Sequence, residues 1–281
     1  MRSLELAVKY LAGERLIGTA VERAALTTLG SAGWTEMDSS KVSINTSTSK
    51  IDFALTTGSS HNIYYPITVE DDTWQLRSII NFTAGANANS GVGNQKMRFG
   101  FATLGDEDGE GLPTEGIVAT FQDHGESSAN ERWYCNGTGG SNIYTGHSHG
   151  TTSGVDYYLT LKRTSTTAIS LDLKTVSYSG TSLTDFPLTT SVASGTDNLA
   201  YLYLAGGRTD LRSNTSPPDP PLSGTIRAIQ VWQTTAGTGD PDFEPTFTNS
   251  YPNLSNGTIF EESDTGKHYM FDGTSAWNEV T

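Results

Sequence analysis

The densest group of acidic side chains in the 281-residue chain is the run Asp106-Glu107-Asp108-Gly109-Glu110-Gly111. Asp106, Asp108 and Glu110 alternate on a segment punctuated by glycine, which offers hard oxygen ligands at a spacing that suits Ca²⁺. The run is not a complete EF-hand loop, and a solvated acidic turn is the alternative interpretation. We therefore treat these three residues as candidate calcium ligands and expect no other cofactor.

The same acidic run is where the sequence could supply a pair of catalytic carboxylates. A retaining glycosidase needs two neighbouring carboxyl groups, one as the acid and one as the nucleophile. The glycines at 109 and 111 place the run on a loop, where catalytic geometry is hard to maintain. We therefore expect no catalytic residues and no enzymatic activity. The alternative to a non-enzymatic protein is a carbohydrate-active enzyme, either a glycoside hydrolase or a polysaccharide lyase.

A second group of candidate residues combines aromatic rings with amide and imidazole groups. Sugar faces stack on aromatic rings, and short polar side chains then hydrogen bond to the sugar hydroxyls. The candidate glycan-binding residues are Trp133, Tyr134, Asn136, Tyr144, His147 and His149. Two alternatives stay open: Trp133 and Tyr134 are ordinary strand residues, one inside and one outside, and the two histidines hold a transition metal. No cysteine or acid lies beside the histidines to support a metal.

The elements that must position these residues are strands. From Trp34 onward the pattern has a period of two, and it is clearest in Thr73–Phe82. The runs Asp156–Arg163 and Thr167–Tyr178 predict a hairpin, and the apolar run Ser223–Trp232 predicts an inner strand. Further strands are expected at Lys41–Asn45, Ile51–Leu55, Asn62–Ile67, Lys96–Thr103, Gly116–Gln122, Glu131–Asn136 and Leu199–Ala205. Many short strands separated by turn residues predict an antiparallel jelly-roll β-sandwich over residues 34–235.

The two ends of the chain differ from this sandwich. Residues 1–33 show helical spacing in Ser3–Leu11 and a capping box at Thr19–Glu22, so a short N-terminal helical arm is expected. Residues 236–256 have no period and are interpreted as a linker. Residues 257–281 predict a small three-stranded β-meander with an aromatic face. A meander this small is marginal alone, so we expect at least one end to pack on another copy of the chain.

The overall composition excludes several classes of protein. The formal net charge of −14 argues against nucleic acid as a partner, because binding to phosphates needs a basic surface. The single Cys135 cannot form an internal disulfide. No apolar run reaches transmembrane length, and charge appears too early at the N-terminus for a secretory signal. We expect no membrane partner and a route out of the cell by lysis or by assembly into a particle.

Two segments resemble known families. The strand Gly-Thr-Ile-Arg-Ala-Ile-Gln-Val-Trp (224–232) and the strand Tyr157–Arg163 resemble those of concanavalin-A-like and laminin-G-like β-sandwich domains. The tail that begins Gly-Thr-Ile-Phe-Glu-Glu at Gly257 resembles a short β-module of structural proteins in tailed phages and archaeal viruses.

Together these resemblances imply a mainly β virion surface protein with a lectin-like domain, such as a capsid decoration, turret, fibre or tail component. It would be found on the virion, outside cells. Its partners would be other virion proteins, copies of itself and glycans.

Overall fold

The structure is a computed structural model that describes residues 15–18, 33–55, 61–84, 95–104, 113, 115–123, 132–139, 142–148, 151–192, 196–208, 222–245, 257–272 and 277–280. The chain divides into two compact units. The sandwich unit consists of residues 33–45 and 50–245, and the terminal unit consists of residues 1–32, 46–49 and 246–281. Within the described residues there is no helix, and therefore none long and apolar enough to cross a membrane.

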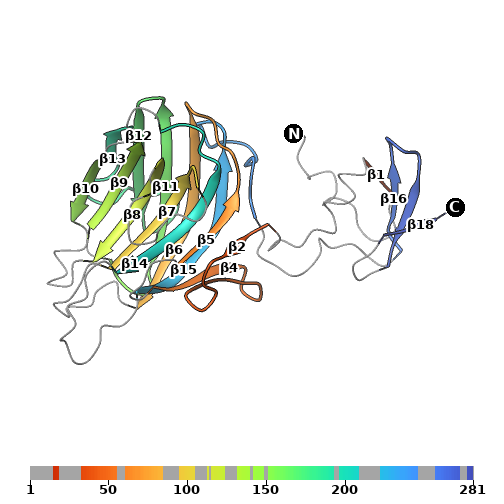
Figure 1. Ribbon diagram of the computed structural model, residues 1–281, viewed down its shortest axis with the longest axis horizontal. Coiled ribbons are helices and arrows are strands. Elements are labelled where there is room, and N and C mark those ends of the chain that lie inside the picture. The colour runs from red at the N-terminus through yellow and green to blue at the C-terminus, as the bar shows by residue number, and fades with distance from the viewer. Residues whose placement is uncertain are drawn as a thin grey trace. The chain divides into compact units, whose positions relative to one another are not determined.

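The sandwich unit contains two seven-stranded sheets in which every strand pairing is antiparallel. Figure 1 shows them as two layers of strands. Sheet I has the order β10-β9-β8-β7-β14-β5-β2. Its strands are β2 (Thr35–Glu36), β5 (His61–Pro66), β7 (Gln95–Ala102), β8 (Glu115–Asp123), β9 (Arg132–Gly139), β10 (Asn142–Ser148) and β14 (Tyr201–Arg208).

Sheet II has the order β13-β12-β11-β6-β15-β4-β3. Its strands are β3 (Val42–Asn45), β4 (Lys50–Leu55), β6 (Trp74–Ala84), β11 (Asp156–Ser165), β12 (Ala168–Lys174), β13 (Leu188–Ser191) and β15 (Leu222–Trp232). The burial of β12 alternates without a break along its seven residues, as expected for a strand with one face on a core.

Aromatic side chains from the two sheets interlock to form the core. The ring of Phe82 on β6 lies 4.6 Å from that of Phe121 on β8 and 6.1 Å from that of Trp133 on β9. Trp74 on β6 contacts Phe101 on β7 in an edge-on arrangement with the ring centroids 4.8 Å apart. Large aromatic residues at alternate strand positions bury the most apolar area for each residue, so they fix which face of each sheet is internal.

The structure confirms the predicted antiparallel strands to within a few residues and adds others. The strand at Asn142–Ser148 was not predicted, and it pairs with β9 from Asn142–Thr138 to Ser148–Arg132. Strand β12 ends at Lys174, so the expected strand Thr167–Tyr178 is too long. The chain leaves the sheet there, and the Tyr178 ring returns to contact that of Tyr158 at 5.1 Å.

The strand at Ser223–Trp232 contains a bulge that its sequence pattern reflects. The register of β15 against β6 shifts between Arg227 and Gln230, and Ala228 has a φ of +50°. The bulge keeps Ile226 and Ile229 on the buried side although three positions separate them, which a regular strand cannot do. The bulge therefore explains why the apolar residues of this strand do not follow a strict period of two.

The first ten residues of the expected linker, 236–245, belong to the sandwich unit. The Val231 amide donates to the Phe243 carbonyl oxygen at 2.9 Å, and the Asp242 amide donates to that of Val231 at 2.8 Å. The Tyr65 ring lies 4.8 Å from that of Phe243 and 5.3 Å from that of Trp34. One tyrosine thus contacts residues near both the first and the last positions of the sandwich unit.

The terminal unit is a four-stranded sheet with the order β1-β16-β17-β18. The predicted meander is present as β16 (Ile259–Glu262), β17 (His268–Phe271) and β18 (Trp277–Val280). The added strand β1 (Arg15–Gly18) pairs in parallel with β16. The predicted helices at Ser3–Leu11 and after Thr19 lie outside the described residues, whereas the part of the predicted arm that is described is a strand.

The pairing of β1 with β16 predicts that the N-terminal segment protects the C-terminal meander. A variant that lacks residues 1–18 should expose the β16 edge, because the backbone groups that pair with β1 then face water. We expect amide hydrogen exchange in Ile259–Glu262 to become at least about tenfold faster, with β11 in the sandwich unit as the internal control. Unchanged exchange in β16 would contradict the pairing.

Candidate functional site

The face of sheet I that points away from the core carries polar side chains at its centre. Along β7, Met97, Phe99 and Phe101 are buried in the core, so the intervening Arg98 and Gly100 belong to the opposite face. Strand registers place one row of residues across this face as Asn62, Ala205, Arg98, Thr120 and Tyr134. The next row is Tyr64, Tyr203, Gly100, Val118 and Asn136.

We call this surface the polar face of sheet I. It offers amide, hydroxyl and guanidinium groups beside phenol rings. The residues that define it are Asn62, Tyr64, Arg98, Thr120, Tyr134, Asn136 and Tyr203.

The polar groups of this face are enclosed. The side chains of Arg98, Thr120 and Asn136 are exposed by only 2%, 4% and 4%. Between them lies a small apolar cluster of Ala102, Val118, Ala205 and the Tyr203 ring, against which Tyr64 packs. Burying a polar side chain costs free energy of folding unless the group is hydrogen bonded.

Two of these groups lack a hydrogen-bond partner. The Thr120 hydroxyl and the Asn136 side-chain carbonyl oxygen are buried without one. Val118 is the register partner of Asn136, and Thr120 follows Val118 by two positions, so the two residues are diagonal neighbours on adjacent strands. In folded proteins such buried atoms are satisfied by water, by a ligand or by a local adjustment.

The structure places the predicted glycan-binding residues in different surroundings. Trp133 is fully buried, with its ring 5.2 Å from that of Phe121, so it is part of the core and cannot stack on a sugar. Tyr134 is half-buried on the polar face, and Asn136 is buried there. The alternative in which Trp133 points in and Tyr134 points out is therefore the one observed. An aromatic residue type alone does not indicate which face of a strand it occupies.

The remaining predicted residues are placed only by their backbone or not at all. The Cα atom of Tyr144 is the register partner of Asn136, and that of His147 is the partner of Trp133. His149 and the candidate calcium ligands Asp106, Asp108 and Glu110 lie outside the described residues. Among the residues that are described, no group of three or more histidine, cysteine or acidic residues could hold a metal ion.

Sequence reasoning did not single out Arg98, Thr120, Asn62 or Tyr203. A signal for Arg98 was present, because it is the charged residue between Met97 and Phe99 in an alternating strand. The internal Cys135 contributes no reactive group, because burial raises the pKa of its thiol and keeps it protonated. Within the described part of the polar face there is no carboxylate, so this part supplies no catalytic acid pair of the kind that glycosidases use.

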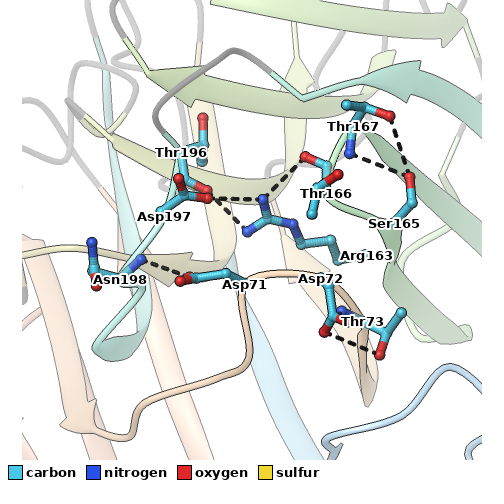
Figure 2. Close-up of polar contacts among 10 residues, drawn as sticks. All are labelled: Asp71, Asp72, Thr73, Arg163, Ser165, Thr166, Thr167, Thr196, Asp197 and Asn198. Carbon is cyan, nitrogen blue, oxygen red and sulfur yellow. Dashed lines mark hydrogen bonds and ion pairs between the residues drawn. The ribbon is translucent and has the colours of Figure 1, made fainter.

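Two carboxylates elsewhere in the sandwich unit, those of Asp71 and Asp197, stabilise the fold (Figure 2). The buried Arg163 guanidinium donates to the carbonyl oxygens of Thr196 at 2.9 Å and Thr166 at 3.2 Å, and to Asp197 Oδ1 at 3.2 Å. Asp71 Oδ1 accepts a hydrogen bond from the Asn198 amide at 2.7 Å. These contacts tie together the segments around Asp71, Thr166 and Asp197, and they engage the carboxylates in holding the fold.

Comparison with solved structures gives matches at low sequence identity. No protein-family model and no curated protein matches the chain. The Emp47p carbohydrate recognition domain matches with a TM-score of 0.49 and 9% identity, over 72% of this chain and 89% of that chain. The legume lectin-like domain from Entamoeba histolytica has a TM-score of 0.43 and 9% identity, over 72% and 91% of the two chains.

Peanut lectin matches with a TM-score of 0.43 and 10% identity, over 73% of this chain and 94% of its own. A crystal structure of an HCR/D mutant matches over 72% of this chain, and this chain spans only 43% of the length of that one. The first three of these structural neighbours are legume-lectin-like, concanavalin-A-like β-sandwich domains. At this level of identity the similarity concerns the fold alone.

The unpartnered hydroxyl of Thr120 leads to a prediction about stability. In Thr120→Val a methyl group replaces the hydroxyl at nearly the same volume, so the cost of an enclosed unpartnered group disappears. We expect the free energy of unfolding of the ligand-free protein to rise by about 1 kcal/mol in urea titrations. The matched control is Thr160→Val on sheet II, because that hydroxyl is not among the enclosed atoms that lack a partner. Equal or lower stability of Thr120→Val would mean that the Thr120 hydroxyl is satisfied in solution.

Proposed function

We propose that the sandwich unit binds glycans through the polar face of sheet I. The observation that carries this proposal is the pair of unpartnered atoms on Thr120 and Asn136. A sugar is rich in hydroxyl groups that both donate and accept, so one hydroxyl can accept from Thr120 while another donates to Asn136. Both atoms are enclosed in the ligand-free structure, so binding requires the residues that cover them to move. The half-buried rings of Tyr64 and Tyr134 at this face offer surfaces on which a sugar ring can stack.

The proposed action is binding without catalysis. Hydrolysis of a glycosidic bond uses two carboxyl groups on either side of the bond. The described part of the polar face offers neutral hydrogen-bonding groups and one guanidinium in place of such a pair. This composition is suited to holding a polyol and to fixing its orientation.

Glycan binding predicts that Asn136 and Tyr134 affect affinity and that sheet II does not. On a glycan array the intact protein should bind a defined subset of sugars. Asn136→Ala and Tyr134→Ala should each reduce affinity for those sugars by about tenfold or more, because a hydrogen bond or a stacking surface is lost. The matched control is Tyr158→Ala, another half-buried strand tyrosine, which lies on sheet II. Absence of binding to any glycan, or equal losses in the control, would overturn the proposal.

We further propose that the protein is a structural component exposed on a virus particle, where many copies act together. The support is the resemblance of the tail to a module of virion proteins and the acidic, turn-rich composition. Repetition on a particle would convert weak sugar contacts into firm attachment.

The particle proposal predicts that mass spectrometry of purified virus particles will detect this chain in a fixed ratio to the main capsid protein. The comparison sample is the soluble fraction of the same lysate, which should contain less of it. Absence from every particle fraction would contradict the virion role and would leave the glycan-binding proposal to its own test.

A further inference from the structure

Sheet II also has a face that points away from the core, and its chemistry differs from that of sheet I. Strand β6 places Arg77 on this face opposite Thr160 of β11, and Lys162 of β11 is the register partner of Gln75. Arg77 and Lys162 are therefore diagonal neighbours on adjacent strands, close enough for their long side chains to reach a shared point. Both are half-buried.

Aromatic rings hold the guanidinium of Arg77 in place. Its central carbon lies 4.8 Å from the ring centroid of Trp232 and 5.3 Å from that of Tyr178. The Lys174 ammonium donates to the carbonyl oxygen of Tyr178 at 2.9 Å, which fixes the segment that carries the tyrosine. Two such contacts limit the rotamers of the arginine, so little freedom remains to be lost when it binds a ligand.

Three carboxylates on this face contact other groups, although Asp172 Oδ1 is buried without a hydrogen-bond partner. Asp156 pairs with Arg227 at 2.5 Å, and Asp172 lies 3.5 Å from the Lys174 ammonium. Glu244 accepts a hydrogen bond from Gln230 at 2.7 Å.

Arg77 and Lys162, in contrast, form no ion pair with any described residue. Two neighbouring cations without a dedicated acid are unexpected on a chain with a net charge of −14.

The electrostatics of Lys162 agree with this geometry. Burial, followed by repulsion from Arg77, lowers the pKa of its ammonium group, and the attraction of Asp172 opposes this shift only in part. Beside it, Arg77 Nε and the Tyr178 hydroxyl are buried without a hydrogen-bond partner. Positive charge and spare donors thus converge on one place.

We propose that Arg77 and Lys162 form a binding site for an oxyanion, the sulfate or carboxylate group of an acidic ligand. An oxyanion accepts charge-assisted hydrogen bonds from both side chains and removes the repulsion between them. The guanidinium can bind two oxygens of such a group, and the ammonium a third. Asp172 offsets part of the positive charge beside Lys162, so the site suits one oxyanion group at a time. This site lies on the opposite sheet from the polar face of sheet I and does not depend on glycan binding there.

The probe for this site is inorganic sulfate, with chloride at matched ionic strength as the reference. Calorimetric titration of the full chain should detect sulfate binding, and Lys162→Met should weaken it by about tenfold or more. The matched control, Lys267→Met, removes an exposed lysine of the terminal unit and should leave sulfate affinity unchanged. Equal heats with chloride, or equal affinity in Lys162→Met, would overturn the proposal.

Two further measurements separate binding from a structural role and identify the source of the group. Without sulfate, Lys162→Met should melt at the same or a higher temperature, since it relieves repulsion; a purely structural lysine would give a lower melting temperature. In NMR titrations, bound sulfate should raise the pKa of Lys162, because the anion favours the charged form.

A comparison of dextran sulfate with free sulfate identifies the source of the anionic group, with neutral dextran as the blank. Tighter binding of dextran sulfate would indicate a group carried on a polysaccharide. Equal affinities would indicate the free ion. A Lys162 pKa that does not respond to sulfate would count against the site.

Discussion

The packing of aromatic side chains between the two sheets determines how the rest of the sandwich unit is used. Phe82 lies at its centre, with ring centroids 4.6 Å from Phe121, 6.1 Å from Trp133 and 6.3 Å from Tyr157. A shift of one residue in any strand would turn these rings toward solvent, so the core fixes the register and the facing of each strand. The polar side chains of the strands then lie mainly on the two outer faces and at the strand ends. The positions of Arg98 and Arg77 on opposite outer faces are a consequence of that constraint.

Close backbone approaches maintain this register. A side chain at Gly224 would place its Cβ atom 2.2 Å from the Asn81 carbonyl oxygen, and one at Gly100 would place it 2.3 Å from that of Ile117. Contacts that short do not occur between real Cβ atoms and backbone oxygens, so both positions require glycine. Gly100 lies in the middle of the polar face of sheet I, where its missing side chain leaves Tyr203 and Val118 as the flanking groups. The requirement for tight strand pairing and the shape of the candidate site therefore coincide at one residue.

Local alternation in the sequence was enough to predict most strands, because burial of one sheet face imposes a period of two. It was not enough for Trp133, whose neighbour Tyr134 is also aromatic, so the pattern does not say which ring is internal. It failed at Asn142–Ser148, where glycine and serine hide a strand that is stabilised by pairing with β9. The parallel pairing of Arg15–Gly18 with Ile259–Glu262 joins opposite ends of the chain. Such contacts depend on the whole fold and leave no local pattern.

The two outer faces are physically separate, although one core supports both. Thr120 and Lys162 lie on different sheets, and face-to-face sheets pack about 10 Å apart. Sites at that separation with no shared partners contribute almost additively to stability. The faces also differ in kind: the described part of sheet I encloses polar groups with few formal charges. Sheet II carries half-buried charges, of which Asp156–Arg227 and Asp172–Lys174 are paired, whereas Arg77 and Lys162 are paired with no described residue. A neutral ligand rich in hydroxyls suits the first arrangement, and a charged group suits the second. Because the core transmits only global stability between them, a substitution that changes binding on one face without changing the melting temperature must act on that face.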